Sequence, residues 1–204
     1  MLIASEEQER DQQGQSRRGD GFFVESGGLR PEAESLLEGV LREAAASFDE
    51  RKVRILARFY AALEYDDSAS AADAYFLLRQ ISQLTYRQIV ALSVVAEREQ
   101  YERELIFANR GQVQASGPDL RRPDPVLDME LRDLADRGLV GIAVGRQAAR
   151  LNDAVAGLEP LYQIGYGKLR LLPAAQQLMA LVGDGVVSEE ERRDWLEQLK
   201  GVPR

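Results

Sequence analysis

The side chains of this chain that could take part in catalysis or bind a metal ion are mainly carboxylates. The chain has 34 aspartates and glutamates but neither histidine nor cysteine. Without imidazole and thiolate groups, the chain lacks the usual ligands of zinc sites, haem and iron–sulfur clusters and the partners of Ser-His or Cys-His relays. Disulfides are also excluded, so nothing points to an oxidising compartment. The remaining options are acid–base work by carboxylates and oxygen-ligand sites for Mg²⁺ or Ca²⁺.

The acidic clusters of the chain lie where helices are expected to begin or end. Asp66-Asp67 follows one expected helix, and three glutamates at 189–191 open another. Carboxylates at such positions serve the helix end first, through capping and the helix dipole. We therefore predict no catalytic residue, no metal site and no cofactor. A carboxylate-dependent Mg²⁺ enzyme is kept as an alternative, and it requires several buried carboxylates to converge in one pocket.

A basic stripe is expected on a helix that begins at about residue 49. Arg51, Arg54 and Arg58 are spaced three and four residues apart, so they share one helix face. One interpretation is a solvated face that pairs with the acidic helix at 32–43. The other is a docking surface for an acidic partner or a phosphate backbone. We take these three arginines as candidate partner-binding residues.

The overall charge favours protein partners over nucleic acid. The formal net charge is −8 and the pI about 4.8, so phosphate is repelled unless a local basic patch prevails. The first ten residues lack the basic and apolar regions of a secretory signal, and no run of apolar residues is long enough to cross a bilayer. We expect a cytoplasmic protein without membrane contact that binds a protein partner, with a homodimer as a further possibility.

The pattern of the chain predicts a mainly α-helical fold in two parts. Residues 1–30 are polar and predict a disordered tail, in which Phe22-Phe23-Val24 either docks on the core or serves as a short partner motif. A helical subdomain is expected at 31–108, with capping boxes at Ser70-Ala-Ala-Asp73 and Thr85-Tyr-Arg-Gln88 and a long helix from about 86 to 107. Residues 109–125 are rich in Gly, Pro and polar side chains and predict a linker.

The remaining residues, 126–204, predict alternating helices and short strands. A helix at 127–137 ends at Gly138, and an apolar strand follows at 139–144. Further elements are expected as a helix at 146–158, a strand at 166–172, a helix that starts at Pro173 and a last helix behind the capping box Ser188-Glu-Glu-Glu191.

Three of these segments resemble parts of a winged-helix domain: Thr85–Ala96, Leu127–Ile142 and Lys168–Val182. The resemblance implies a winged-helix-like C-terminal unit with a small β-ribbon, whose third helix would enter the DNA major groove. That helix carries four carboxylates against two arginines, which repels phosphate. The resemblance therefore implies partner recognition through its exposed side, for which the candidate residues are Arg132, Asp133 and Asp136.

A second resemblance is to uncharacterised bacterial helical proteins akin to the abortive-infection alpha family. The segments that carry it are Glu50–Ala57, Leu84–Ile89 and Arg137–Val140. It implies a role in bacterial defence against phage. Together these observations lead us to expect a non-catalytic protein-interaction or regulatory subunit of a bacterial stress or phage-defence system. A winged-helix DNA-binding regulator is the first alternative and the Mg²⁺ enzyme is the second.

Overall fold

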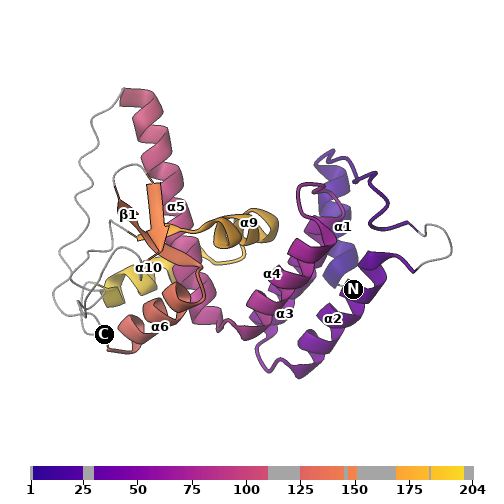
Figure 1. Cartoon of the computed structure of the whole chain (residues 1–204), viewed down its shortest axis with the longest axis horizontal. Helices are drawn as coiled ribbons and strands as arrows, with labels where there is room; N and C mark the ends of the chain where they lie inside the picture. Colours follow the sequence, from indigo (N-terminus) through magenta and orange to yellow (C-terminus); the bar gives the residue numbers. More distant parts are fainter. Residues whose placement is uncertain are drawn as a thin grey trace. The chain divides into compact units, whose positions relative to one another are not determined.

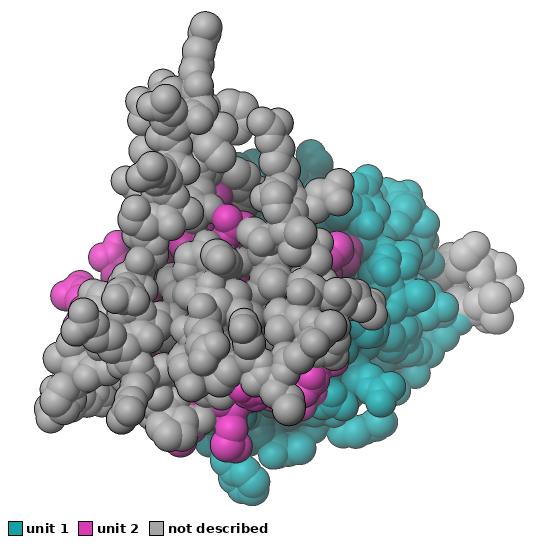
Figure 2. Space-filling model, turned by 60° about the vertical axis from the view of Figure 1, so that its left-hand side comes forward, with its two compact units in different colours: residues 1–86, 180–186 teal, residues 87–179, 187–204 magenta. Residues whose placement is uncertain are grey.

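The computed structural model describes residues 2–24, 30–109, 125–144, 147–150, 169–183 and 185–199. Contacts divide the chain into two compact units, which Figure 2 distinguishes by colour. Unit 1 comprises Met1–Tyr86 and Ala180–Val186, and unit 2 comprises Arg87–Met179 and Val187–Arg204. The linker predicted at 109–125 lies almost entirely outside the described residues.

The division between the units falls where the long helix begins, not in the predicted linker. The sequence assigns this helix to the N-terminal subdomain, whereas its side chains contact C-terminal elements. Arg87 pairs with Glu130, and the side-chain amide of Gln88 donates to Asp133 over 2.7 Å. Periodicity identifies a helix but does not say which neighbours its faces will contact.

The described residues of unit 1 form the helices α1 (Leu2–Gln12), α2 (Glu32–Ala46), α3 (Glu50–Leu63) and α4 (Ala71–Gln83). Helix α3 contacts the other three, and α2 also contacts α4 (Figure 1). The apolar stripes of α2, α3 and α4 meet in a core whose largest fully buried side chains include Leu36, Ile55, Leu56, Phe59, Leu63, Leu77 and Ile81.

Local sequence signals account for the ends of these helices. Asp49 caps α3 by accepting a hydrogen bond from the backbone N–H of Arg51 over 3.0 Å. The predicted capping box of α4 is confirmed, because Ser70 and Asp73 each accept a backbone hydrogen bond from the other. Both arrangements satisfy N–H groups that have no partner within the helix.

The prediction of a disordered tail at 1–30 is wrong for the described part of that segment. Residues 2–12 form α1, and the side chain of Phe22 is buried in unit 1. The backbone N–H of Ala33 donates to Phe22, and Phe23 packs edge-on against Tyr60. The aromatic pair thus docks on the core, as one interpretation of the sequence expected. Residues 25–29 lie outside the described residues.

Gly39 allows α2 and α4 to approach closely. A Cβ atom at this position would lie 2.9 Å from Cδ2 of Leu78. We expect Gly39→Ala to be nearly neutral, because its gain in helix propensity of about 1 kcal/mol offsets a small shift of Leu78. Gly39→Val should destabilise the chain by about 1–3 kcal/mol through overpacking. Urea unfolding followed by circular dichroism measures both, and equal stability of the two variants would contradict the close contact.

Unit 2 consists of helices around a small antiparallel sheet. Its elements are α5 (Tyr86–Asn109, of which Tyr86 belongs to unit 1), α6 (Pro125–Asp136), β1 (Val140–Val144), β2 (Gln147–Arg150), β3 (Leu169–Leu171), α9 (Pro173–Val182, whose end belongs to unit 1) and α10 (Glu189–Leu199). The strands are ordered β2-β1-β3. A mainly helical fold with a small β element is therefore confirmed. Among the described helices, none is long and apolar enough to cross a membrane.

Several predicted boundaries of unit 2 agree with the structure. Gly138 follows α6 with a φ of 69°, and the strand expected after it is β1. Pro173 begins α9, and Gly183 follows it with a φ of 78°. Ser188 and Glu191 form the third predicted capping box. These signals are local, so they survive without knowledge of the tertiary contacts.

The prediction of a helix at 146–158 is wrong for residues 147–150, the part of this segment that the structure describes. Gln147–Arg150 form strand β2, which pairs antiparallel with β1, so that Gln147 lies opposite Val144. Backbone pairing with β1 outweighs the local preference of these residues for a helix. The rest of the predicted helix lies outside the described residues.

The outer edge of β3 is covered by two side chains of α5. Because the N–H of Leu172 donates back to Leu139, the backbone groups of Leu169 and Leu171 point away from β1. Arg98 donates to the carbonyl of Leu169, and Oε1 of Glu99 accepts the N–H of Leu171 over 2.7 Å. This pair of side chains replaces the neighbouring strand that β3 lacks among the described strands.

Candidate functional site

The basic stripe lies on α3 as predicted, and its first two arginines are exposed. Arg51 is paired with Asp49 and its guanidinium lies 4.1 Å from the ring centroid of Tyr86. Arg54 is paired with Glu50 at 2.8 Å. The guanidinium charges of this half of the stripe are thus partly balanced by acidic residues at the start of the same helix.

Arg58, the third arginine of the stripe, is bound by α1. Its Nε lies 3.0 Å from both carboxylate oxygens of Glu6, and both side chains are largely buried, with exposed fractions of 22% and 24%. Arg54 thus contacts Glu50 of its own helix, and Arg58 contacts Glu6 of α1. The expected pairing of the stripe with the acidic helix at 32–43 stays a prediction.

Helix α1 makes further polar contacts with residues that directly follow the end of α3. The hydroxyl of Tyr65 lies 3.0 Å from the carbonyl oxygen of Glu7 and 2.7 Å from Oδ1 of Asp11. Arg17 bridges Asp11 and Glu64. Burial and the hydrogen bond to Asp11 raise the pKa of Tyr65 to about 12, so its hydroxyl remains a hydrogen-bond donor at neutral pH.

The pKa values of two carboxylates of α1, Asp11 and Glu7, are shifted in opposite directions. Hydrogen bonds from Arg17 and then Tyr65 lower the pKa of Asp11, so this contact favours docking at neutral pH and is lost as the pH falls through the lowered pKa. Burial, followed by the charge of Glu64, raises the pKa of Glu7. The charged Glu7 therefore opposes docking at neutral pH, and acidification relieves this penalty.

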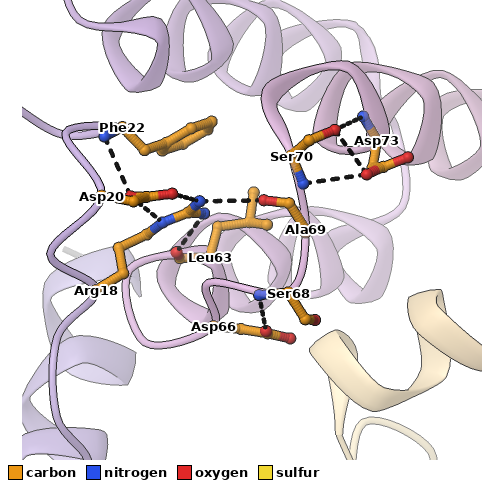
Figure 3. Close-up of polar contacts among 9 residues, drawn as sticks. All are labelled: Arg18, Asp20, Phe22, Leu63, Asp66, Ser68, Ala69, Ser70 and Asp73. Carbon is orange, nitrogen blue, oxygen red and sulfur yellow. Dashed lines mark hydrogen bonds and ion pairs between the residues drawn. The ribbon is translucent and has the colours of Figure 1, made fainter.

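Arg18 ties the N-terminal segment to the loop between α3 and α4 (Figure 3). Its guanidinium donates to the carbonyl oxygens of Leu63 and Ala69 over 3.3 and 3.1 Å and pairs with Asp20. It also lies over the ring of Phe22, 4.3 Å from the centroid. The side chain is only 1% exposed, so this contact is structural and unlike the solvent-facing arginines of α3.

Phe48 is the most exposed large apolar side chain of the described residues. It precedes the N-cap Asp49, and its relative exposure is 107%. An apolar residue at this position often packs against the fourth residue of the helix, here Val53. Its exposure shows that Phe48 does not make that packing contact. An unpacked aromatic side chain thus precedes the helix start that carries the exposed arginines Arg51 and Arg54.

The second predicted surface lies on α6, in unit 2. Arg132 and Asp136 are exposed, as expected for contact residues. Asp133 instead accepts hydrogen bonds from Gln88 and Arg137 over 2.7 and 2.8 Å, and these contacts lower its pKa, with Arg137 as the larger cause. Asp133 therefore helps to fix α6 on α5. A role of the α6 surface in partner binding stays a prediction.

Sequence reasoning missed Glu6, Arg18, Phe48 and Tyr65. The segment around Arg18 is rich in Arg, Gly and Ser, which is typical of a loop, and α1 has no apolar stripe. A usable signal was the aromatic pair at 22–23, since a docked anchor restrains the residues before it. Phe48 could be placed at a helix start, but its exposure could not be known.

The described residues contain no group of three or more carboxylates placed to hold a metal ion. Comparison of the chain with protein-family models, curated proteins and solved structures found no match.

Proposed function

We propose that this chain is a non-catalytic protein-interaction subunit that binds its partner through the start of α3. The contact surface comprises Phe48, Arg51 and Arg54, which we call the Phe48 surface. The observation that carries the proposal is the complete exposure of Phe48 directly before a helix whose first turns carry two exposed arginines. A bacterial stress or phage-defence setting and a winged-helix C-terminal unit stay parts of the proposal that rest on resemblance alone.

The composition of the Phe48 surface favours a protein partner. Aromatic and arginine side chains are over-represented among the residues that dominate protein–protein binding. Burying a fully exposed phenylalanine contributes about 1.5–3 kcal/mol. The chain's own fold does not use that contribution, so a partner with an apolar pocket can gain it.

The ion pairs of the stripe argue against a phosphate backbone as the partner. Binding of nucleic acid depends on cations that neutralise phosphates and release counterions. Here Asp49 and Glu50 already accompany Arg51 and Arg54, and the chain carries a net charge of −8. A protein pocket that receives Phe48 and hydrogen-bonds the guanidinium groups fits this surface better.

A photo-crosslinking residue at position 48 should trap the partner in the source cells. With the purified partner, Phe48→Ser combined with Arg54→Ala should weaken binding by roughly 30-fold or more, because an aromatic anchor and an arginine contact are both lost. Arg51 is left unchanged because it stacks on Tyr86. The affinity can be measured by calorimetry.

Arg79→Ala is the matched control, since Arg79 is an exposed arginine on α4 of the same unit. It should leave the affinity unchanged. Equal affinity of the Phe48→Ser/Arg54→Ala variant and the unchanged chain would reject the Phe48 surface.

A further inference from the structure

The hydrogen bonds and the ion pair that hold helix α1 on unit 1 are made by polar side chains, and the helix buries little apolar surface. None of its 11 residues is buried, Leu2 is 45% exposed and Ile3 is half-buried. The contacts that hold it are the Glu6–Arg58 pair, the Tyr65 hydrogen bonds and a hydrogen bond from Arg10 to the carbonyl of Leu181. Water still reaches about a quarter of the Glu6 and Arg58 side chains, so added salt weakens this contact.

The residues after α1 are anchored much more firmly. Arg18 and Phe22 are buried, and the backbone N–H of Arg18 donates to Glu64 over 2.8 Å. Residues 13–16, between α1 and this anchor, are all exposed. An α1 that is released from α3 therefore stays tethered nearby, at an effective concentration on the order of millimolar.

We propose that the surface beneath α1, formed by Arg58 and Tyr65, is a second docking site that accepts an acidic helix of another protein. Helix α1 is its intramolecular occupant and competes with that helix. This site is separate from the Phe48 surface, and the two proposals stand or fall independently. The seated α1 shows the chemistry of the ligand, because its carboxylates are complementary to the arginine and the tyrosine.

The contacts also define the spacing that a competing helix needs. Glu6 meets Arg58 and Asp11 meets Tyr65, so α1 runs in the same direction as α3. Two carboxylates five residues apart lie about 7.5 Å apart along a helix axis. At the position of Glu7, a negative charge opposes binding, because this side chain faces the largely buried carboxylate of Glu64. A neutral residue there should bind better than a glutamate.

The test uses the full chain and a fluorescent peptide of residues 1–16. In the chain, Glu6→Arg combined with Asp11→Arg leaves the surface intact and repels its own α1. The peptide should bind this variant at least about tenfold more tightly than it binds the unchanged chain, because the tethered competitor is gone. Arg58→Ala in the same variant should abolish binding. Fluorescence anisotropy at low salt measures the affinities.

Two peptide variants separate a specific site from general attraction between charges. The Glu6→Gln peptide should bind about three- to tenfold more weakly, because it loses the charge-assisted contact with Arg58. The Glu7→Gln peptide should bind more tightly, because it removes a like charge from Glu64. Both peptides lose one negative charge, so equal weakening of both would overturn the proposal.

Amide hydrogen exchange shows whether α1 leaves the surface. Residues 2–12 should exchange faster in the Glu6→Arg/Asp11→Arg chain than in the unchanged chain, with little change at 30–83. Unaltered exchange of α1, or failure of the released chain to bind the peptide, would overturn the proposal. A concentration-dependent dimer of the unchanged chain that exchanges α1 between copies would also overturn it. The peptide assay needs no cellular partner, so its outcome does not depend on the Phe48 surface.

Discussion

Replacing Arg18 with alanine should lower the free energy of unfolding of unit 1 by about 2–4 kcal/mol. The buried guanidinium satisfies the carbonyl oxygens of Leu63 and Ala69 and covers the ring of Phe22. Alanine leaves both carbonyl oxygens without this donor and opens space beside the aromatic ring. Amide hydrogen exchange of α3 and α4 under native conditions measures the loss.

Two variants test whether the shape of the guanidinium matters. Arg18→Lys keeps the charge. Its single ammonium group cannot reach the carbonyl oxygens of Leu63 and Ala69 as the forked guanidinium does, so this variant should recover less than half of the lost stability. Arg30→Ala is the matched control. Its side chain is 47% exposed and its ion pairs with Glu34 and Glu38 lie at the surface, so it should cost about 1 kcal/mol or less. Equal losses from Arg30→Ala and Arg18→Ala would contradict the anchor.

Glu99→Ala should destabilise unit 2 by about 1–3 kcal/mol, because the N–H of Leu171 loses its acceptor in a buried place. The chain has one tryptophan, Trp195, which is buried in unit 2 and reports on its unfolding by fluorescence. The variant should also expose the edge of β3 and promote strand pairing between copies. Sedimentation at rising concentration measures that association.

The matched variants for this edge are Glu99→Gln and Glu97→Ala. In the first of them, the new side-chain amide oxygen can still accept from the N–H of Leu171, so Glu99→Gln should lose less stability than Glu99→Ala. Glu97 is 62% exposed and pairs with Arg192, so its replacement should cost about 1 kcal/mol or less. If Glu97→Ala destabilises as much as Glu99→Ala, the side chain of Glu99 does not protect β3.

Helix positions were predictable where the signal is local. The capping residues Ser70 and Ser188, the glycine after α6 and the proline that begins α9 each act within a few residues of themselves. The same local reasoning assigned 147–150 to a helix. There the competing interaction is backbone pairing with β1, which a pattern of side chains does not reveal.

The candidate site was predictable in part for the same reason. The spacing of Arg51, Arg54 and Arg58 places them together on one face of α3, and the structure agrees. Their different roles depend on other segments. Arg58 is held by Glu6, 52 residues away in the chain, whereas Arg54 is paired within its own helix. No local pattern distinguishes these two arginines.

The sequence by itself determined the helical character of the chain, most of the helix ends and the absence of imidazole and thiol chemistry. These properties depend on residue types and on neighbours within one or two turns. Only the tertiary structure decided that α1 covers Arg58, that Arg18 is buried and that Phe48 is left exposed. Each of these outcomes depends on which distant segments come together. Contacts between distant segments are selected by the packing of the whole unit, which the order of residues does not display locally.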